Sequence, residues 1–235
     1  MEPGKDIVFA DWDLDTIIHN LNPDRDDEVG RITTLLQTGQ LEDAFEWLRR
    51  ETNRYTWVML AAAYLSIRQN QLDEARRWLR AITLIGTESV MQLWAWRNLR
   101  RLGKEPPHEI SKKVLGIVIE VPNGNSEDIL ASYLDGTARF ISHAGGIILW
   151  EEYHDQITSL IHEGIKMAHP TGSPVEKPAQ SAVADGEVRL TILTPGGLYV
   201  WEGSPEEGSD MARLFARQAV LLKALIQIAL ENRSG

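Results

Sequence analysis

The chain contains no cysteine, and this absence excludes disulfide bonds, thiolate nucleophiles and cysteine-ligated zinc. It also has no apolar run approaching the roughly 20 residues of a membrane-spanning helix, and its acidic N-terminus lacks the basic and apolar regions of a signal peptide. With 43% hydrophobic and 25% charged residues, the composition is that of a folded globular protein. We therefore expect a soluble, cytoplasmic protein that makes no contact with a membrane.

Recognisable catalytic and metal-binding motifs are missing as well. The sequence holds no HExxH motif, P-loop or dinucleotide fingerprint. His154 and His162 lie on one predicted helix, about 12 Å apart along its axis, which is too far for two ligands of one metal. Ser142, His143 and Asp155 have the residue types of a hydrolytic triad, but no Gly-x-Ser-x-Gly elbow presents the serine. We expect no metal, no cofactor and a non-catalytic protein rather than an enzyme.

Basic residues are in the minority and are concentrated in the middle of the chain. The net charge is −10, with −9 over residues 1–46, +6 over residues 47–107 and −7 over residues 108–235. The excess of acidic residues argues against nucleic acid as the partner, because nucleic-acid binding relies on neutralising phosphates. An arginine-rich middle thus lies between two acidic flanks.

The chain contains an internal repeat whose first copy begins before the arginine-rich region and whose second copy lies inside it. The stretches TGQLEDAFEWLRRE (38–51) and RQNQLDEARRWLRAI (68–82) align with Leu41 on Leu72, and apolar residues recur there at the helical spacing of three and four. A period of about 31 residues is close to that of helical hairpins that stack on one another. We therefore predict stacked helical hairpins over about residues 26–102.

These residues resemble the tetratricopeptide repeat (TPR) family, in which a small residue in the second helix lets the first helix pack closely against it. Ala44 and Ala75 match that position, and Leu48 and Leu79 match the large apolar residue four positions later. The chain departs from the family in its period, which is about 31 residues where the family has about 34. The resemblance implies a scaffold for protein binding that carries no chemistry of its own.

The Pro106-Pro107 pair ends the helical region, because proline cannot continue a helix. Beyond it the pattern changes to short β-rich runs with an Asp135-Gly136 hairpin turn, two helices and a Pro/Ser/Ala-rich connection that we predict to be mobile. The predicted fold class is α+β. A TPR-like helical domain at residues 1–107 precedes a domain at residues 108–235, which has an antiparallel sheet and the order ββββ-α-ββ-α.

One phrase occurs twice in the C-terminal half, as GGIILWE (145–151) and GGLYVWE (196–202). Each copy has the pattern of a returning hairpin strand that leads into an amphipathic helix, so we predict two β-turn-β-α units. Strand alternation places Trp201 on the same face as Tyr199, and Trp150 is the equivalent tryptophan. We expect Trp150 and Trp201 to anchor their helices on the sheet. The alternative is a ligand or partner surface that includes these tryptophans and Tyr199.

Four arginines have the spacing to share one surface of the predicted hairpins. Arg76 and Arg80 are four residues apart on one helix, and Arg97 and Arg101 repeat this spacing on the next. Guanidinium groups on such an arginine ridge suit two-point contacts with carboxylates. The alternative roles are pairing with the acidic N-terminal segment of the same chain and binding of RNA.

The sequence as a whole favours a bacterial-type, non-catalytic adaptor that binds a partner protein through an acidic patch on that partner. One alternative is an inhibitor or immunity-type protein whose acidic surface blocks a basic partner. Another is a hydrolase whose active-site residues are dispersed along the chain.

Overall fold

The chain divides into two compact units, one α+β and one helical. The computed structural model describes residues 8–10, 28–50, 56–85, 88–124, 126–179 and 181–231. The α+β unit consists of Met1–Ala10, Glu88–Leu93 and Pro106–Gly235, and the helical unit consists of Asp11–Thr87 and Trp94–Glu105. The long final stretch of the α+β unit begins at Pro106, and this unit also includes residues that precede the predicted boundary at 107–108.

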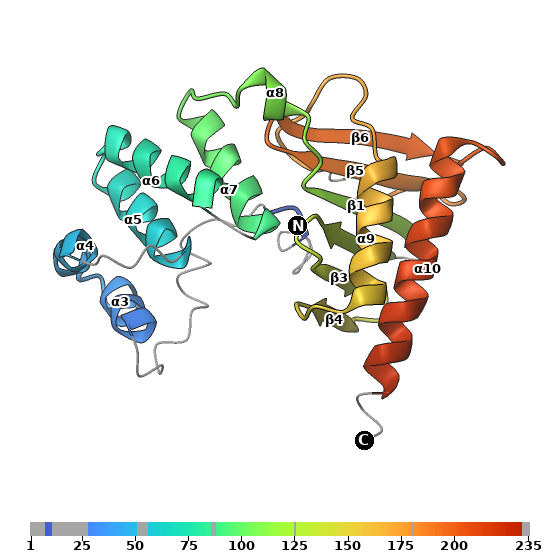
Figure 1. Cartoon of the computed structure of the whole chain (residues 1–235), viewed down its shortest axis with the longest axis horizontal. Helices are drawn as coiled ribbons and strands as arrows, with labels where there is room; N and C mark the ends of the chain where they lie inside the picture. Colours follow the sequence, from blue (N-terminus) through green and yellow to red (C-terminus); the bar gives the residue numbers. More distant parts are fainter. Residues whose placement is uncertain are drawn as a thin grey trace. The chain divides into compact units, whose positions relative to one another are not determined.

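In the described part of the chain, six strands form one antiparallel sheet (Figure 1). After the short helix α8 (His108–Ser111), the elements of this unit follow the chain order ββββ-α-ββ-α. Their bounds are β1 (Gly116–Asn123), β2 (Ser126–Tyr133), β3 (Ala138–Ile141), β4 (Ile147–Trp150), α9 (Asp155–Met167), β5 (Val188–Thr194), β6 (Gly197–Gly203) and α10 (Asp210–Glu231). The α+β class is therefore confirmed. The spatial order of the strands differs from the chain order and is β4-β3-β2-β1-β5-β6, because β5 pairs with β1 and not with β4.

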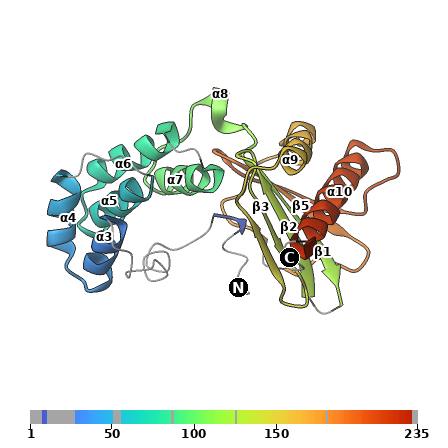
Figure 2. The same ribbon diagram turned by 60° about the horizontal axis from the view of Figure 1, so that its bottom comes forward.

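The repeated Gly-Gly phrase forms the two outer strands of this sheet. β4 and β6 lie at opposite edges, and each pairs with the strand that precedes it in the chain. Helix α9 follows β4, helix α10 follows β6, and both helices cover the same face of the sheet (Figures 1 and 2). The two β-turn-β-α units therefore flank the central β1–β2 hairpin, one on each side.

The helix-covered face carries the main apolar core of the unit. Alternate strand residues point to this face, and they include Ile117, Ile119, Leu130, Leu190 and Ile192. They pack against buried residues at helical spacing, namely Ile157, Leu160, Ile161 and Ile165 of α9 and Leu214, Leu221 and Leu225 of α10. Gly164 lets the two helices approach closely, because a β-carbon there would collide with the side-chain amide of Gln218 on α10.

The opposite face of the sheet buries a charged cluster around Arg189. The Arg189 side chain is 0% exposed; its Nε donates to Glu202 at 2.8 Å, and Nη1 lies 3.5 Å from Oε1 of Glu120. Its Nη2 donates to the backbone oxygen and the hydroxyl of Ser181, at 2.9 and 3.1 Å. Arg189 thereby joins β5 to β1, to β6 and to the segment that precedes β5.

The connection between α9 and β5 is fixed to this face at two points and to the β6 edge of the sheet at one. Val175 forms a β-bridge with Leu198 of β6, Ser181 binds Arg189, and the N–H of Val183 donates to Glu127 at 2.9 Å. We call residues 168–187 the strap. Its composition predicts a mobile linker, and the structure attaches it to the sheet through Val175, Ser181 and Val183.

A short N-terminal segment also belongs to the α+β unit. Val8, Phe9 and Ala10 are all buried, and the Tyr133 hydroxyl donates to the backbone oxygen of Val8 at 2.7 Å. Burial raises the pKa of Tyr133 far above its usual value, so the phenol stays protonated and remains a donor. This contact links residues 125 positions apart and explains why the segment 8–10 belongs with the sheet.

Replacing Tyr133 by Phe is expected to destabilise the protein by about 1–3 kcal/mol, because the buried Val8 carbonyl loses its donor. Tyr153→Phe is a matched control, since Tyr153 is 80% exposed and its hydroxyl donates to Asp155 at the surface. Urea unfolding followed by tryptophan fluorescence measures both variants. Equal unfolding midpoints for the two variants would mean that the Val8 contact contributes nothing to stability.

The two Gly-Gly turns need glycine for different reasons. Gly145 and Gly197 have φ values of 83° and 132°, in the region that favours glycine. Gly196 instead packs against backbone: its N–H donates to the Ser111 oxygen at 2.9 Å, and a β-carbon would lie 2.7 Å from that oxygen. At Gly146 the nearest atom to a β-carbon would be 3.7 Å away, which is an ordinary contact.

Gly196→Ala should therefore destabilise the protein by about 1–3 kcal/mol through this backbone clash, whereas Gly146→Ala should change stability by less than about 0.5 kcal/mol. Thermal unfolding followed by circular dichroism compares the two variants directly. A smaller effect for Gly196→Ala than for Gly146→Ala would contradict the close approach of Ser111 to the β5–β6 turn.

The described part of the helical unit contains two hairpins followed by most of a fifth helix. The helices are α3 (Glu28–Gln37), α4 (Leu41–Arg50), α5 (Thr56–Arg68), α6 (Leu72–Ile85) and α7 (Ser89–Arg101). The core of the hairpins includes Ile32, Leu36, Ala44, Val58, Ala62 and Leu65. Helix α5 is buried over most of its length, in agreement with its almost entirely apolar sequence.

The turns of the two hairpins have the same conformation and the same hydrogen bond. Gly39 and Asn70 occupy equivalent positions in the two copies of the repeat, and both have positive φ, of 74° and 56°. The residue after each donates back across the end of the helix, from Gln40 to Leu35 at 2.9 Å and from Gln71 to Ser66 at 2.7 Å. The alanines one turn into the second helices, Ala44 and Ala75, are both 0% exposed. The two copies of the sequence repeat therefore have the same backbone conformation at their turns. The likeness of the hairpins to the TPR family stays a prediction.

Candidate functional site

An apolar hollow of about 290 Å³ opens beside α10 on the helix-covered face of the sheet. Its floor and walls come from Ile119, Val121, Leu130, Phe140, Val188, Pro205, Phe215, Ala219 and Leu222. Among the described residues, polar side chains reach this lining only from Asp128 and Gln218. Val121 is 39% exposed and Ala219 is also exposed, so the hollow is open to solvent. Apolar hollows with few polar groups are the usual form of binding pockets in proteins.

The packing of α10 determines where this hollow lies. On the side toward α9, Arg217 pairs with Glu163 at 3.0 Å, and Gln218 lies against Gly164. The Gln218 amide oxygen also accepts a hydrogen bond from Ser132 of β2 at 3.4 Å. These contacts hold α10 close to α9, and the far side of α10 is left to form one wall of the hollow.

A polar group of three residues lies at the rim, around Asp128. The His143 backbone N–H donates to Asp128 Oδ1 at 2.8 Å, and His143 Nδ1 lies 2.9 Å from the same oxygen. Asn123 donates to Asp128 Oδ2 at 3.0 Å. Partial burial opposes ionisation of Asp128, but the hydrogen bonds from Asn123 and His143 outweigh it and hold the pKa of Asp128 below its usual value.

The Asp128→Asn variant is expected to be slightly less stable than the wild type at pH 7, by less than about 1 kcal/mol because the carboxylate is partly exposed. The folded state binds the ionised form better, so this stabilisation exists above the unfolded-state pKa of about 3.9 and is lost as the pH falls through the lower folded-state pKa. Urea unfolding at several pH values measures the difference. A difference that grows toward acid pH would contradict the lowered pKa.

The hydrolytic triad considered from the sequence is not assembled. Asp155 accepts a hydrogen bond from the Tyr153 hydroxyl at 2.7 Å, and Asp128 is the carboxylate beside His143. The Ser142 hydroxyl accepts from the N–H of Ala144 at 3.2 Å within its own turn. A carboxylate-bound imidazole can exchange protons through its other nitrogen, but Ser142 serves the geometry of the β3–β4 turn.

The three aromatic residues singled out in the sequence lie on the helix-covered face, within or against the core. Trp150 is 9% exposed, and its ring meets His154 edge-on at 5.9 Å between centroids. Trp201 is partly buried and lies 6.0 Å from the Phe215 ring of α10. Tyr199 is 5% exposed. No hydrogen-bond partner for the Trp150 indole N–H is found in the described ranges, although burial of the ring predicts one.

The four arginines predicted to form a ridge are in different environments. Arg97 is only 6% exposed. Arg76 pairs with Asp73 at 2.7 Å and also donates to the backbone oxygen of Leu102 at 3.1 Å, where it caps the C-terminus of α7. Arg80 and Arg101 are exposed. The structure therefore leaves two of the four guanidinium groups on the surface and gives Arg76 a structural contact within the helical unit.

A second hollow in the α+β unit, of about 310 Å³, has acidic walls formed by Glu88, Asp135 and Glu151, with Arg139 beside them. Burial, and then repulsion by Asp135 and Glu151, raises the pKa of Glu88, and Arg139 acts in the opposite direction. The residue after Glu88 is the first residue of α7, Ser89, and its N–H donates to Asp135 at 2.6 Å. Asp135 thus stabilises the start of this helix.

No family model, curated protein or solved structure matches the chain. Within the described ranges, no group of three or more histidine, aspartate or glutamate residues is arranged to hold a metal ion. The same part of the chain contains no helix with the length and apolar character needed to cross a membrane.

Proposed function

We propose that this chain is a non-catalytic adaptor whose helical unit binds a partner protein, as its resemblance to the TPR family implies. The observation that most supports the proposal is the repetition of the hairpin turns, in which Gly39 and Asn70 adopt the same conformation at equivalent positions of the two copies. Stacked hairpins that repeat in this way present a continuous surface along the stack, and such surfaces serve to bind extended partners.

The basic charge of the helical unit is confined to the part after residue 46, and that part favours a partner with an acidic patch. Residues 47–107 carry a net charge of +6, and Arg80 and Arg101 are exposed. Arg77 is exposed as well and pairs with Glu74 on the same helix. Arginine presents a planar fork of donors that matches a carboxylate in two-point contacts, and it stays charged at any physiological pH.

The double variant Arg80→Glu/Arg101→Glu is expected to weaken partner binding on the order of tenfold, because it replaces two attractive contacts by two repulsive ones. Stability should change little, because both side chains are exposed. Affinity capture with quantitative mass spectrometry identifies the partner, and titration of the purified partner at several salt concentrations then gives the affinity. The wild-type complex should weaken as salt rises.

Arg213→Glu provides the control, because Arg213 is an exposed arginine on α10 of the other unit and has one ion pair, with Asp210. This variant should bind the partner as the wild type does. Equal binding by Arg80→Glu/Arg101→Glu and by Arg213→Glu would remove the arginines of the helical unit from the binding surface. Recovery of the same proteins with a variant that cannot fold would show that capture is non-specific.

A further inference from the structure

We propose that the apolar hollow beside α10 is part of a groove that binds a basic amphipathic helix of a partner protein. This inference extends the proposed protein-binding function to a second surface, on the α+β unit. Three observations support this inference. One side of α10 is left uncovered by α9, an apolar stripe runs along that side, and the charge around the hollow is mainly acidic.

An apolar stripe runs along the open side of α10. Phe215, Ala219 and Leu222 line the hollow, and Ile226 and Leu230 continue the stripe beyond it, being 36% and 58% exposed. The spacing of four, three, four and four residues keeps all five on one side of the helix. From Phe215 to Leu230 the stripe spans roughly 22 Å at 1.5 Å per residue. That length suits a helix of about 15 residues better than a small ligand.

The opposite side of α10 is already occupied. Arg217 pairs with Glu163 of α9 there, and Gln218, which also reaches the lining of the hollow, packs against Gly164. Helices that cover one face of a sheet lie side by side, with axes about 8–10 Å apart. A further helix placed beside α10 would therefore rest on the strand residues that form the floor of the hollow, such as Val121 and Leu130.

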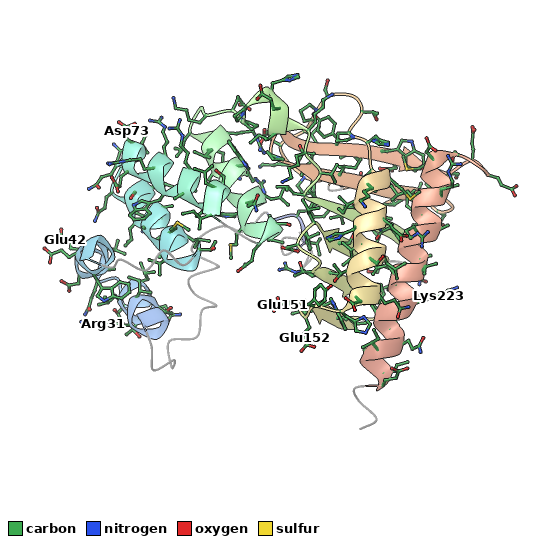
Figure 3. All side chains as sticks on the ribbon, in the orientation of Figure 1. Arg31, Glu42, Asp73, Glu151, Glu152 and Lys223 are labelled. Atoms are coloured by element: carbon green, nitrogen blue, oxygen red, sulfur yellow. The ribbon has the colours of Figure 1, made fainter. Side chains whose placement is uncertain are left out.

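The charge around the hollow selects a basic partner. Asp128 lies in the lining itself, and the exposed Glu206 and Glu207 follow the lining residue Pro205 in the chain. On α10, Lys223 projects away from α9 (Figure 3) and is the basic residue next to the lining residue Leu222. Arg139 and Arg189 are also chain neighbours of lining residues, but strand alternation places them on the opposite face, and Arg217 pairs with Glu163. The acidic residues Asp128, Glu206 and Glu207 therefore outnumber the one remaining lysine. Lysine and arginine on the polar face of an incoming helix complement such a rim.

The test uses the full-length protein and a fluorescein-labelled, 18-residue peptide of leucine and lysine arranged as an amphipathic helix. Fluorescence anisotropy should show binding of this peptide, with at least tenfold weaker binding of a scrambled peptide of the same composition and of a leucine–glutamate counterpart. Equal binding of the scrambled peptide would overturn the inference, since it would show general attraction between opposite charges. Equal binding of the leucine–glutamate peptide would overturn the requirement for a basic partner.

Two substitutions on α10 locate the binding site. Ala219→Gln places a larger polar side chain in the hollow and should weaken binding of the leucine–lysine peptide at least tenfold. Ala216→Gln, an exposed alanine of the same helix outside the lining, should leave binding unchanged. Both variants should keep the same melting temperature within a few degrees. Equal binding by the two variants would overturn the inference.

A third variant, Glu206→Gln/Glu207→Gln, should weaken binding about threefold to tenfold and reduce its dependence on salt. The helical-unit variant Arg80→Glu/Arg101→Glu separates this inference from the proposed function, because it should bind the peptide as the wild type does. If that variant lost the peptide while Ala219→Gln retained it, the peptide would bind the helical unit, and the groove would be excluded. Binding of phosphatidylcholine vesicles in place of the peptide would also overturn the inference, in favour of a lipid surface.

Discussion

The central strands of the sheet are buried on both faces, and the covering of these two faces determines the organisation of the α+β unit. In β1 and β5, consecutive residues are buried, so the side chains on both faces of these strands are shielded from water. An antiparallel sheet commonly leaves one face solvated, and its strands then alternate between apolar and polar residues. Here two helices cover one face, while the strap and the buried residues 8–10 lie against the other. The two covers are built differently: the helices form an apolar core, whereas the strap is held by hydrogen bonds.

One attachment of the second cover, at Ser181 of the strap, depends on a buried cation. A guanidinium group without water needs several acceptors, and Arg189 finds them on Glu120, Glu202 and Ser181. Leaving such a charge without a partner typically costs about 3–5 kcal/mol. The position of the strap is therefore specified by electrostatics and not by apolar packing alone. This explains how a segment rich in Pro, Ser and Ala can lie on a sheet without joining it as a strand.

Local patterns in the sequence predict the elements well because each pattern has a local physical cause. The two copies of the helical repeat have the same turn conformation at Gly39 and Asn70, and the two copies of the repeated phrase each belong to a hairpin that leads into a helix. The pairing of β5 with β1 could not be predicted from such patterns. Strand periodicity indicates which face of the sheet a residue occupies, but it does not indicate which strand lies beside it.

The polar group at the rim of the hollow was missed for the same reason. Asp128 and His143 lie in different hairpins, and their contact depends on the pairing of β2 with β3. Composition also failed to separate the arginines. Arg80 and Arg97 have the same residue type and the same spacing from a neighbouring arginine, yet one is exposed and the other is buried. Burial of a charged residue depends on tertiary contacts, which helical spacing alone does not determine.

The burial of residues 8–10 in the α+β unit gives the chain the topology of a domain insertion. The chain leaves the α+β unit after Ala10, re-enters it for Glu88–Leu93, and belongs to it again from Pro106 onward. The Tyr133–Val8 hydrogen bond therefore closes a loop of 125 positions, and that loop contains the whole of the helical unit. Closing a loop of this length lowers the entropy of the chain, and the burial of residues 8–10 has to offset that cost when the protein folds.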